Sequence, residues 1–148
     1  MSSSVFFKLF EYCLQKKISP YVRFNDQQHG FRPNYSTGTA CFVLKETVLN
    51  YFKSKSDVYA CFIDIKKAFD SVNHEILMRK LLNSGIPVEY VNIINHFYSN
   101  QFVNVRYKSV FSEEWKINNG VRQGGVLSGL LFNIYINSLI EKISSLKQ

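Results

Sequence analysis

The sequence predicts a mixed α/β fold in which helices outnumber strands. Several stretches carry apolar residues at three- and four-residue intervals, which is typical of helices with one buried face. A six-residue apolar run at 58–63 and an alternating stretch at 101–107 instead favour strands. Of the 148 residues, 46% are hydrophobic and 16% aromatic, which is ample material for one core. We therefore expect an α/β (α+β) chain with a small antiparallel sheet packed by helices on one side.

The first predicted helix can be capped by Ser3 or Ser4 and stops before Pro20, because proline disfavours the helical conformation in the residue before it. Its apolar positions, with Glu11 among the polar residues between them, are Val5, Phe6, Leu9, Phe10, Cys13, Leu14 and Ile18. A loop punctuated by Gly and Pro covers 25–36, and Ser36 is a suitable N-cap for a second helix.

The apolar run at 58–63 predicts a strand buried on both faces. Asp64 comes where this strand leaves the core, and Lys66 and Lys67 place positive charge beside it. One interpretation of Asp64 is an ordinary turn residue at a strand end. The other is a ligand-binding carboxylate, because open sheets bind their ligands at such strand ends.

Two short helices follow, at 76–82 and 88–98, with Gly85 and Pro87 between them. The alternating stretch 101–107 and a second strand at 115–117 predict an antiparallel hairpin. A glycine-rich turn at 119–127 then leads into a helix that we expect Ser128 to cap. Backbone amides in such a turn can approach phosphate or a base pair closely.

Charge and cysteine content narrow the class of protein. Eighteen Lys and Arg residues against eleven Asp and Glu give a net charge of +7, which favours a polyanionic partner. The cysteines, Cys13, Cys41 and Cys61, stand singly in apolar patterns, which predicts reduced core residues in an intracellular protein of the cytoplasm or nucleus. A secretion signal and a membrane-spanning run are both absent from the sequence, so we expect neither secretion nor membrane insertion.

The stretch Phe-Ile-Asp-Ile-Lys-Lys-Ala-Phe-Asp-Ser-Val at 62–72 resembles the first catalytic motif of reverse transcriptases from non-LTR retrotransposons and group II introns. The resemblance implies that Asp64 binds both catalytic Mg²⁺ ions and that the backbone carbonyl of Ile65 helps to hold one of them. It also implies that Phe69 is an aromatic gate beside the sugar of the incoming nucleotide. A carboxylate oxygen is a ligand that magnesium prefers.

Two further motifs are similar to the same family and follow in its order. The stretch Gln-His-Gly-Phe-Arg-Pro at 28–33, followed by Tyr-Ser-Thr, resembles a motif between fingers and palm. Arg32 in it either pairs with phosphate or hydrogen-bonds local carbonyls. The stretch 120–133 resembles the motif in which Gln and Gly line the pocket of the nascent base pair, and Gln123 and Gly124 match these positions. Gly129 stands where the family usually has Pro.

The resemblance spans residues 4–143 and implies a partial reverse transcriptase domain at 1–148, truncated at both ends. Residues 1–56 would form the fingers side and residues 57–148 the palm. The implied activity is RNA-directed DNA polymerisation with an RNA template, a DNA primer and deoxynucleoside triphosphates. The family's Ala-Asp-Asp motif does not occur in the sequence, so we expect the chain to be inactive alone. The alternatives are a catalytically dead nucleic-acid-binding remnant and an interaction domain without a nucleic-acid role.

Overall fold

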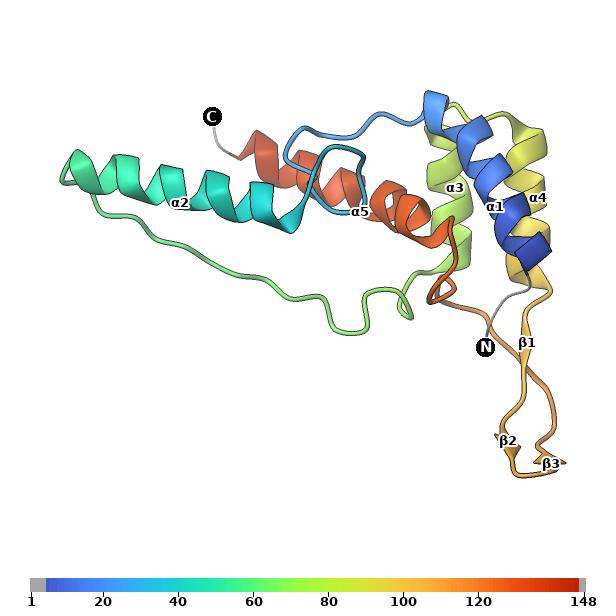
Figure 1. Ribbon diagram of the computed structural model, residues 1–148. Coiled ribbons are helices and arrows are strands. Elements are labelled where there is room, and N and C mark those ends of the chain that lie inside the picture. The colour runs from blue at the N-terminus through green and yellow to red at the C-terminus, as the bar shows by residue number, and fades with distance from the viewer. Residues whose placement is uncertain (1–4, 147–148) are drawn as a thin grey trace.

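The structure is a computed structural model that describes residues 5–146 (Figure 1). Helices dominate this range, and short strands form one projecting hairpin. The helices are α1 (Val5–Ile18), the 3₁₀ turn η1 (Ser19–Tyr21), α2 (Thr37–Lys53), α3 (His74–Asn83), α4 (Val88–Ser99) and α5 (Ser128–Ser145). The strands are β1 (Phe102–Val103), β2 (Arg106–Tyr107), β3 (Val110–Phe111) and β4 (Trp115–Lys116).

The helix ends follow local chemistry at three positions, of which Ser36 and Gly85 were predicted. Ser36 caps α2 by accepting a hydrogen bond from the Thr39 amide at 3.1 Å, as predicted. Asn73 caps α3 by accepting from the Ile76 amide at 3.0 Å. Gly85 follows α3 with a φ of +78°, a conformation that glycine adopts without strain. These caps fix where α2 and α3 begin and where α3 ends.

The predicted cap of α5 was wrong. The N-cap residue is Leu127, which makes no side-chain capping bond. Ser128 is already helical, and its hydroxyl donates to the Arg122 carbonyl at 2.5 Å. The serine therefore ties the preceding loop to the helix instead of capping the helix.

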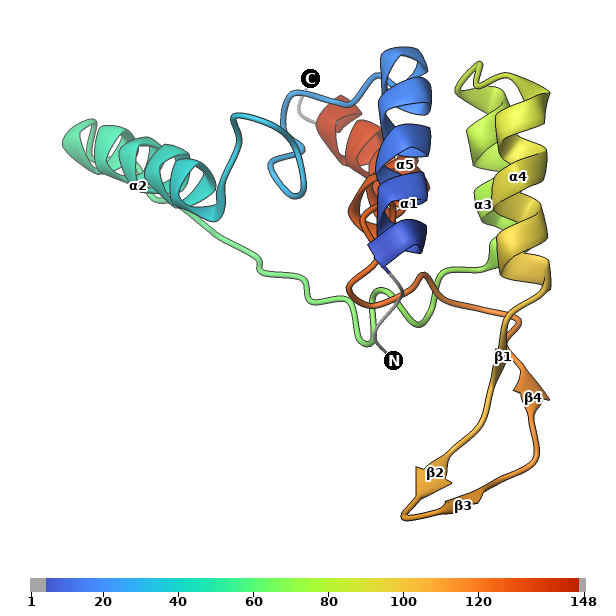
Figure 2. The same cartoon turned by 45° about the vertical axis from the view of Figure 1, so that its right-hand side comes forward.

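The core lies between α3, α4, the first half of α5 and one face of α1. Helix α3 contacts both α4 and α5, and the views place α1 beside α4 (Figures 1 and 2). The largest fully buried apolar side chains are Ile18, Leu77, Leu81, Ile94, Leu131 and Val72. Burial of each such side chain stabilises the fold by roughly 1.5–3 kcal/mol.

The predicted buried stripe of α1 was wrong in its first half. The buried residues of this helix are Glu11, Leu14 and Ile18, whereas Val5 and Phe6 are exposed. The helix is rotated toward α4, where Phe97 packs edge-on against Phe7 with ring centroids 5.2 Å apart. Glu11 is therefore on the buried face, where a backbone amide satisfies its carboxylate.

Helix α2 and the segment after it lie apart from the core (Figure 1). No residue of α2 is buried, and the extended segment 58–63 is exposed along its whole length. The predicted buried strand at 58–63 was therefore wrong. A strand needs a neighbour for its hydrogen bonds, and among residues 5–146 every paired strand belongs to the hairpin instead. Apolar composition favoured a strand here but could not supply its partner.

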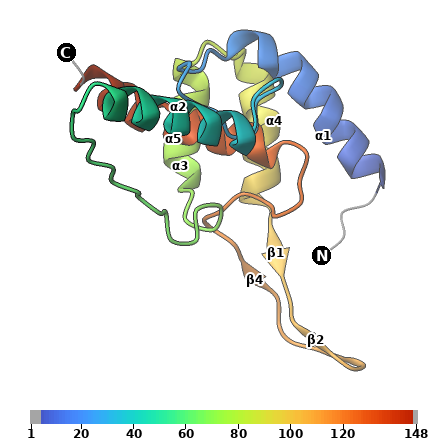
Figure 3. The same cartoon turned by 60° about the vertical axis from the view of Figure 1, so that its left-hand side comes forward.

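The predicted antiparallel hairpin is confirmed. Strand β1 pairs with β4, placing Phe102 opposite Lys116, and β2 pairs with β3, placing Arg106 opposite Phe111. The hairpin extends away from the helices in each view (Figures 2 and 3). Apart from Val103, its strand residues are exposed, so the helices do not cover it. The mixed α/β class with a small antiparallel sheet is thus confirmed, whereas the predicted packing of that sheet by helices on one side was wrong, because its strands project into solvent.

The cysteines are free but not buried. Cys13, Cys41 and Cys61 are all exposed, so their assignment to the core was wrong. Cys13 lies on the exposed side of α1, and the other two lie in the part of the chain that stands away from the core. Within residues 5–146, none of the helices combines the length and the hydropathy needed to cross a bilayer.

Candidate functional site

The first part of the site is a tight turn at 66–71, directly after Asp64 and Ile65. The Ser71 amide donates to the Lys67 carbonyl at 2.9 Å, and Lys67 has a φ of +50°. Both Asp64 and Ile65 are exposed where the extended segment enters this turn. The carboxylate of Asp64 is therefore accessible to solvent beside a hydrogen-bonded turn.

The turn is joined to the second motif by backbone hydrogen bonds. The Val121 amide donates to the Phe69 carbonyl at 2.8 Å, and the Gly120 amide donates to the Val72 carbonyl at 2.7 Å. Gly120 has a φ of +96°, and a Cβ there would lie 3.1 Å from the Cα atom of Asp70. Only glycine meets both demands. Two motifs that are far apart in sequence thus lie side by side.

A side-chain hydrogen bond joins the same two motifs. Gln123 Nε2 donates to Asp70 Oδ1 at 3.0 Å. Gln123 is exposed, and Gly124 follows it with a φ of +80°. The sequence pointed to Gln123 but not to its partner Asp70. The bond restricts the amide of Gln123 to one orientation next to the glycine turn.

A cavity of about 300 Å³ opens between the two motifs. Phe69 lines it from the first motif and Gly124 from the second. The remaining lining residues are Gln15, Phe31, Gly125, Val126, Ser128, Gly129 and Leu130. Phe69 and Gly124 thus line one cavity, and Gln123 immediately precedes Gly124 in the sequence.

Phe69 stands between two other rings. Its centroid lies 5.6 Å from that of Phe31 and 5.1 Å from that of Phe132. Phe31 has a φ of +49°, which is strained for a bulky residue. A Cβ on Gly129 would lie 2.8 Å from Cδ1 of Phe31, so the ring of Phe31 occupies the space next to this glycine. The Pro usual in the family would collide with Phe31 in this position.

Arg32 is engaged by its own loop. Its Nη1 atom donates to the Asn25 carbonyl at 2.8 Å and to the Gln28 carbonyl at 3.1 Å. Its guanidinium also lies 4.2 Å from the ring centroid of Tyr35. These contacts confirm the interpretation of Arg32 as a residue that binds local carbonyls. Contact with phosphate stays a prediction.

A buried amide pair fastens this loop to α5. Gln28 Nε2 donates to Asn133 Oδ1 at 2.7 Å, and Asn133 Nδ2 donates to the Gly30 carbonyl at 2.6 Å. Both side chains are buried, so these bonds offset part of the cost of removing two amides from water, while Gln28 Oε1 is buried without a hydrogen-bond partner. Pattern reading gave no role to Asn133, because a single Asn in an apolar helix carries no recognisable spacing. The pair sets the position of Phe31, which lines the cavity.

Oxygen donors for a metal ion are sparse in the described part of the chain. Residues 5–146 contain no group of three or more His, Cys, Asp or Glu side chains that could hold an ion. Asp64 offers one exposed carboxylate, which suits magnesium in kind because this ion takes one or two protein carboxylates together with substrate phosphates. The donor type therefore fits, with Asp64 as a single carboxylate ligand.

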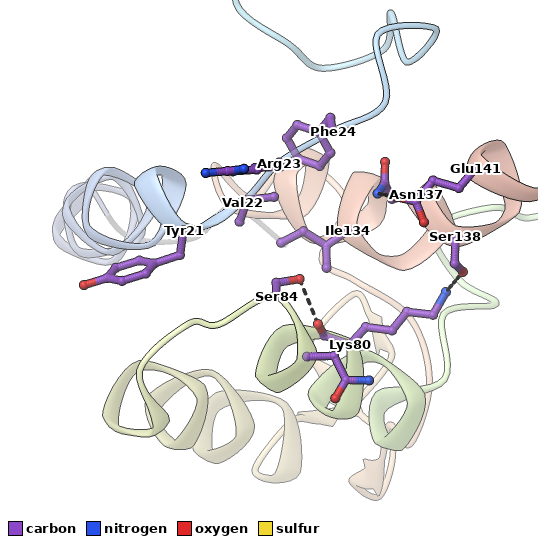
Figure 4. A pocket seen from close by; sticks show the side chains of 11 residues that line it. Tyr21, Val22, Arg23, Phe24, Lys80, Ser84, Ile134, Asn137, Ser138 and Glu141 are labelled. Carbon is purple, nitrogen blue, oxygen red and sulfur yellow. Dashed lines mark hydrogen bonds between the residues drawn. The ribbon is translucent and has the colours of Figure 1, made fainter. Parts of the chain in front are cut away.

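A larger cavity, of about 470 Å³, lies away from both motifs, and none of the predicted site residues lines it. It opens between η1 with its following residues, α3 and α5 (Figure 4). Lys80 reaches across it, donating to the Tyr135 carbonyl and, at 2.7 Å, to the Ser138 hydroxyl. Burial lowers the pKa of Lys80 from its ordinary value. These bonds join α3 to α5, so Lys80 has a structural role here.

Comparisons with known proteins agree with the family that the two joined motifs resemble. Residues 2–147 match the family described as reverse transcriptase (RNA-dependent DNA polymerase). This chain belongs to that reverse transcriptase family. It is 30% identical over 132 residues to a probable RNA-directed DNA polymerase from transposon BS of Drosophila melanogaster, covering 89% of this chain. It is 31% identical over 114 residues to the corresponding protein from transposon X-element of the same organism, covering 77% of this chain.

A bacterial relative shows that the similarity extends beyond animal transposons. The group II intron-encoded protein LtrA of Lactococcus lactis is 32% identical over 130 residues, covering 84% of this chain. The chain spans only 14%, 12% and 19% of the transposon BS, transposon X-element and LtrA proteins, respectively. The matched region is therefore a small part of each of these proteins.

Proposed function

We propose that this chain contributes the nucleotide-facing part of a retrotransposon reverse transcriptase, which copies an RNA template onto a DNA primer. The observation that carries the proposal is the cavity shared by Phe69 and Gly124, with the two motifs held together by two backbone hydrogen bonds at Gly120 and Val121 and one side-chain hydrogen bond from Gln123. Templated polymerisation needs such a surface, because the nascent base pair must be held against a fixed backbone before reaction.

Each wall of the cavity suits one part of a nucleotide. The ring of Phe69 would lie against the sugar and leave no room for a 2′ hydroxyl. Gly124 lacks a side chain, so its backbone can approach a base pair, and the Gln123 amide, oriented by Asp70, would lie beside it. Arg32 would meet a phosphate through guanidinium nitrogens other than Nη1, which the loop carbonyls occupy.

Asp64 and the carbonyl of Ile65 would hold magnesium at the edge of this cavity. The two bound ions would activate the primer hydroxyl and stabilise the leaving pyrophosphate. Asp64 is exposed at the end of an extended segment, so its carboxylate is free to take part in a shared ion shell. The neighbouring Lys66 and Lys67 would attract the triphosphate.

The proposed architecture divides the chain into a fingers side at 1–56 and a palm part at 57–148. The partners would be an RNA template, a DNA primer and deoxynucleoside triphosphates, inside the cell. A net charge of +7 supports binding to nucleic acid. We expect weak affinity for RNA–DNA duplex that falls steeply as salt rises, because counterion release drives such binding. Fluorescence anisotropy at graded salt measures this, and salt-independent binding would contradict the proposal.

Catalytic competence is tested by supplying the missing carboxylates. Residues 1–148 would be fused to the segment that follows the matched region in the transposon BS relative, and primer extension on RNA would be measured with magnesium. We expect extension by the fusion, loss of extension in Asp64→Asn, and retention in Asp57→Asn, which removes an exposed carboxylate at the other end of the extended segment. If the fusion is inactive while the transposon BS relative is active in the same assay, the result would contradict catalysis and favour the nucleic-acid-binding remnant.

A further inference from the structure

Glu11 is the only charged side chain among the buried residues within 5–146. It lies in the middle of α1 and is 4% exposed. Burial of a carboxylate is costly unless hydrogen bonds replace its water. The surroundings of Glu11 are closely packed, since the adjoining cavity between α1, α4 and the loop measures only about 10 Å³.

The partner of the Glu11 carboxylate is the glycine turn of the second motif. Glu11 Oε2 accepts a hydrogen bond from the Val126 amide at 2.9 Å. A Cβ on Gly125 would lie 3.2 Å from Glu11 Oε1 and 2.7 Å from the Ser128 hydroxyl. Because Gly125 has no side chain, the Glu11 carboxylate and the Ser128 hydroxyl can both approach the turn closely.

The turn lines the cavity and is also held by side chains. Gly124, Gly125 and Val126 line the cavity that also contains Phe69. Glu11 holds the Val126 amide, and Ser128, which itself lines the cavity, holds the Arg122 carbonyl. The turn follows the two bonds at Gly120 and Val121 and precedes α5, so these side-chain contacts fix its middle.

We propose that Glu11 is a positioning residue that fixes the turn 123–126 in the conformation that receives the nascent base pair. That the turn receives a base pair rests on the proposed function, whereas the contact between Glu11 and the turn does not depend on it. A hydrogen bond to a charged acceptor is about twice as strong as a neutral one, so a carboxylate is an effective anchor for a glycine-rich turn. This role was not predictable from the sequence, because Glu11 falls between the apolar positions of a helix for which the sequence predicted only a packing role.

The structural part is tested by amide hydrogen exchange of the 148-residue chain. In Glu11→Ala, exchange at Val126 should quicken by about tenfold or more relative to wild type. Glu11→Gln keeps an acceptor oxygen at the same reach and should restore most of the protection, whereas Glu11→Asp is one methylene shorter and should not. Glu89→Ala removes an exposed carboxylate from α4 and serves as the control. Unchanged exchange at Val126 in Glu11→Ala would overturn the proposal.

The functional part is tested in the fusion described above. Loss of turn geometry should raise the KM for deoxynucleotide about tenfold in Glu11→Ala, with recovery in Glu11→Gln and a smaller change in kcat. If Val126 is deprotected but KM is unchanged, Glu11 has no positioning role and the proposal fails. An inactive wild-type fusion would refute the proposed function, while exchange at Val126 would still decide whether Glu11 fixes the turn.

Discussion

At the scale of single residues, Phe69 contacts both the core and the cavity. It packs between Phe31 and Phe132 and also lines the cavity next to Gly124. A residue that only filled the core would be more deeply buried, and a residue that only met substrate would not need two ring partners. The ring is therefore held in place by packing while one face remains available.

Replacement of this ring should separate the two roles of Phe69. In the fusion, Phe69→Ala should raise incorporation of ribonucleotides relative to deoxyribonucleotides by about tenfold or more, because the space of the ring then admits a 2′ hydroxyl. Single-nucleotide kinetics measure this ratio. The accompanying loss of stability should stay below the roughly 3–5 kcal/mol of a fully buried phenylalanine, since Phe69 is only partly buried.

The control for this change is Phe97→Ala, which removes a partly buried aromatic that packs against Phe7 and Phe10 and does not line the cavity of Phe69. It should lower stability while leaving the ratio of ribonucleotide to deoxyribonucleotide incorporation as in wild type. An unchanged ratio in Phe69→Ala would remove Phe69 from the role of sugar gate.

Tyr98 provides a second residue whose behaviour follows from its surroundings. Burial, and then the nearby charge of Glu11, raise the pKa of Tyr98 to about 12 from an ordinary value of 10.0. The folded state thus holds this proton more tightly than the unfolded state. Stability is unaffected below pH 10 and falls as pH rises toward 12, by about 1.4 kcal/mol for each pH unit in this window.

Denaturant unfolding at pH 9, 10 and 11 measures this loss. Tyr98→Phe has no hydroxyl to ionise, so its stability should fall less steeply between pH 10 and 11 than that of wild type. Tyr107→Phe, at an exposed position of β2, should match the wild-type slope. Equal slopes for wild type and Tyr98→Phe would show that the proton of Tyr98 is not held as burial requires.

At the scale of elements, helix boundaries were predictable from local chemistry, whereas the pairing of strands was not. Ser36, Gly85 and Pro87 marked helix boundaries correctly, because capping and turn formation depend on a few neighbouring atoms. The segment 58–63 looked like a buried strand, but a strand depends on a partner that its own composition does not specify. The buried position of Glu11 was missed for a related reason, since its acceptor role depends on Val126, far along the chain.

The unpaired segment 58–63 should make the chain self-associate. It is uncharged, lacks Pro and Gly, and exposes large apolar side chains, with Tyr59 93% and Phe62 82% exposed. Such six-residue segments form intermolecular strand pairs readily. We expect sedimentation velocity of the purified chain at micromolar concentration to show oligomers, and Phe62→Lys to shift the distribution toward monomer.

The matched control for this change is Tyr107→Lys, which places the same charge at an exposed aromatic position of the hairpin. It should leave the distribution of oligomers close to that of wild type. If Phe62→Lys and wild type sediment alike, the segment 58–63 does not mediate the association.

At the scale of the whole molecule, the candidate site depends on contacts between distant parts of the chain. The motif resemblance gave Asp64, Phe69, Gln123 and Gly124 separate roles in one polymerase site, and the structure joins the last three through the turn 66–71 and the loop 119–124. Asp64 lies just outside these contacts, at the end of the extended segment. Its position depends on the segment 58–63, which pairs with no strand among residues 5–146.

The 148-residue chain alone should therefore not polymerise. Two-metal transfer needs several carboxylate oxygens around the ions. The aspartates of the sequence are Asp26, Asp57, Asp64 and Asp70. Asp26 belongs to the loop before α2, Asp57 stands at the opposite end of the extended segment from Asp64, and Asp70 accepts the Gln123 amide. None of them forms an adjacent pair beside Asp64.

Primer extension on an RNA template, with magnesium or manganese and the purified chain, measures this directly, and we expect no product above background. Asp64→Asn is the control for a contaminating polymerase, because contaminant activity would be equal in both preparations. Extension that persists through purification and disappears in Asp64→Asn would contradict the prediction. It would mean that a second copy of the chain completes the ion shell, and mixing Asp64→Asn with wild-type chain would then lower activity more than dilution alone.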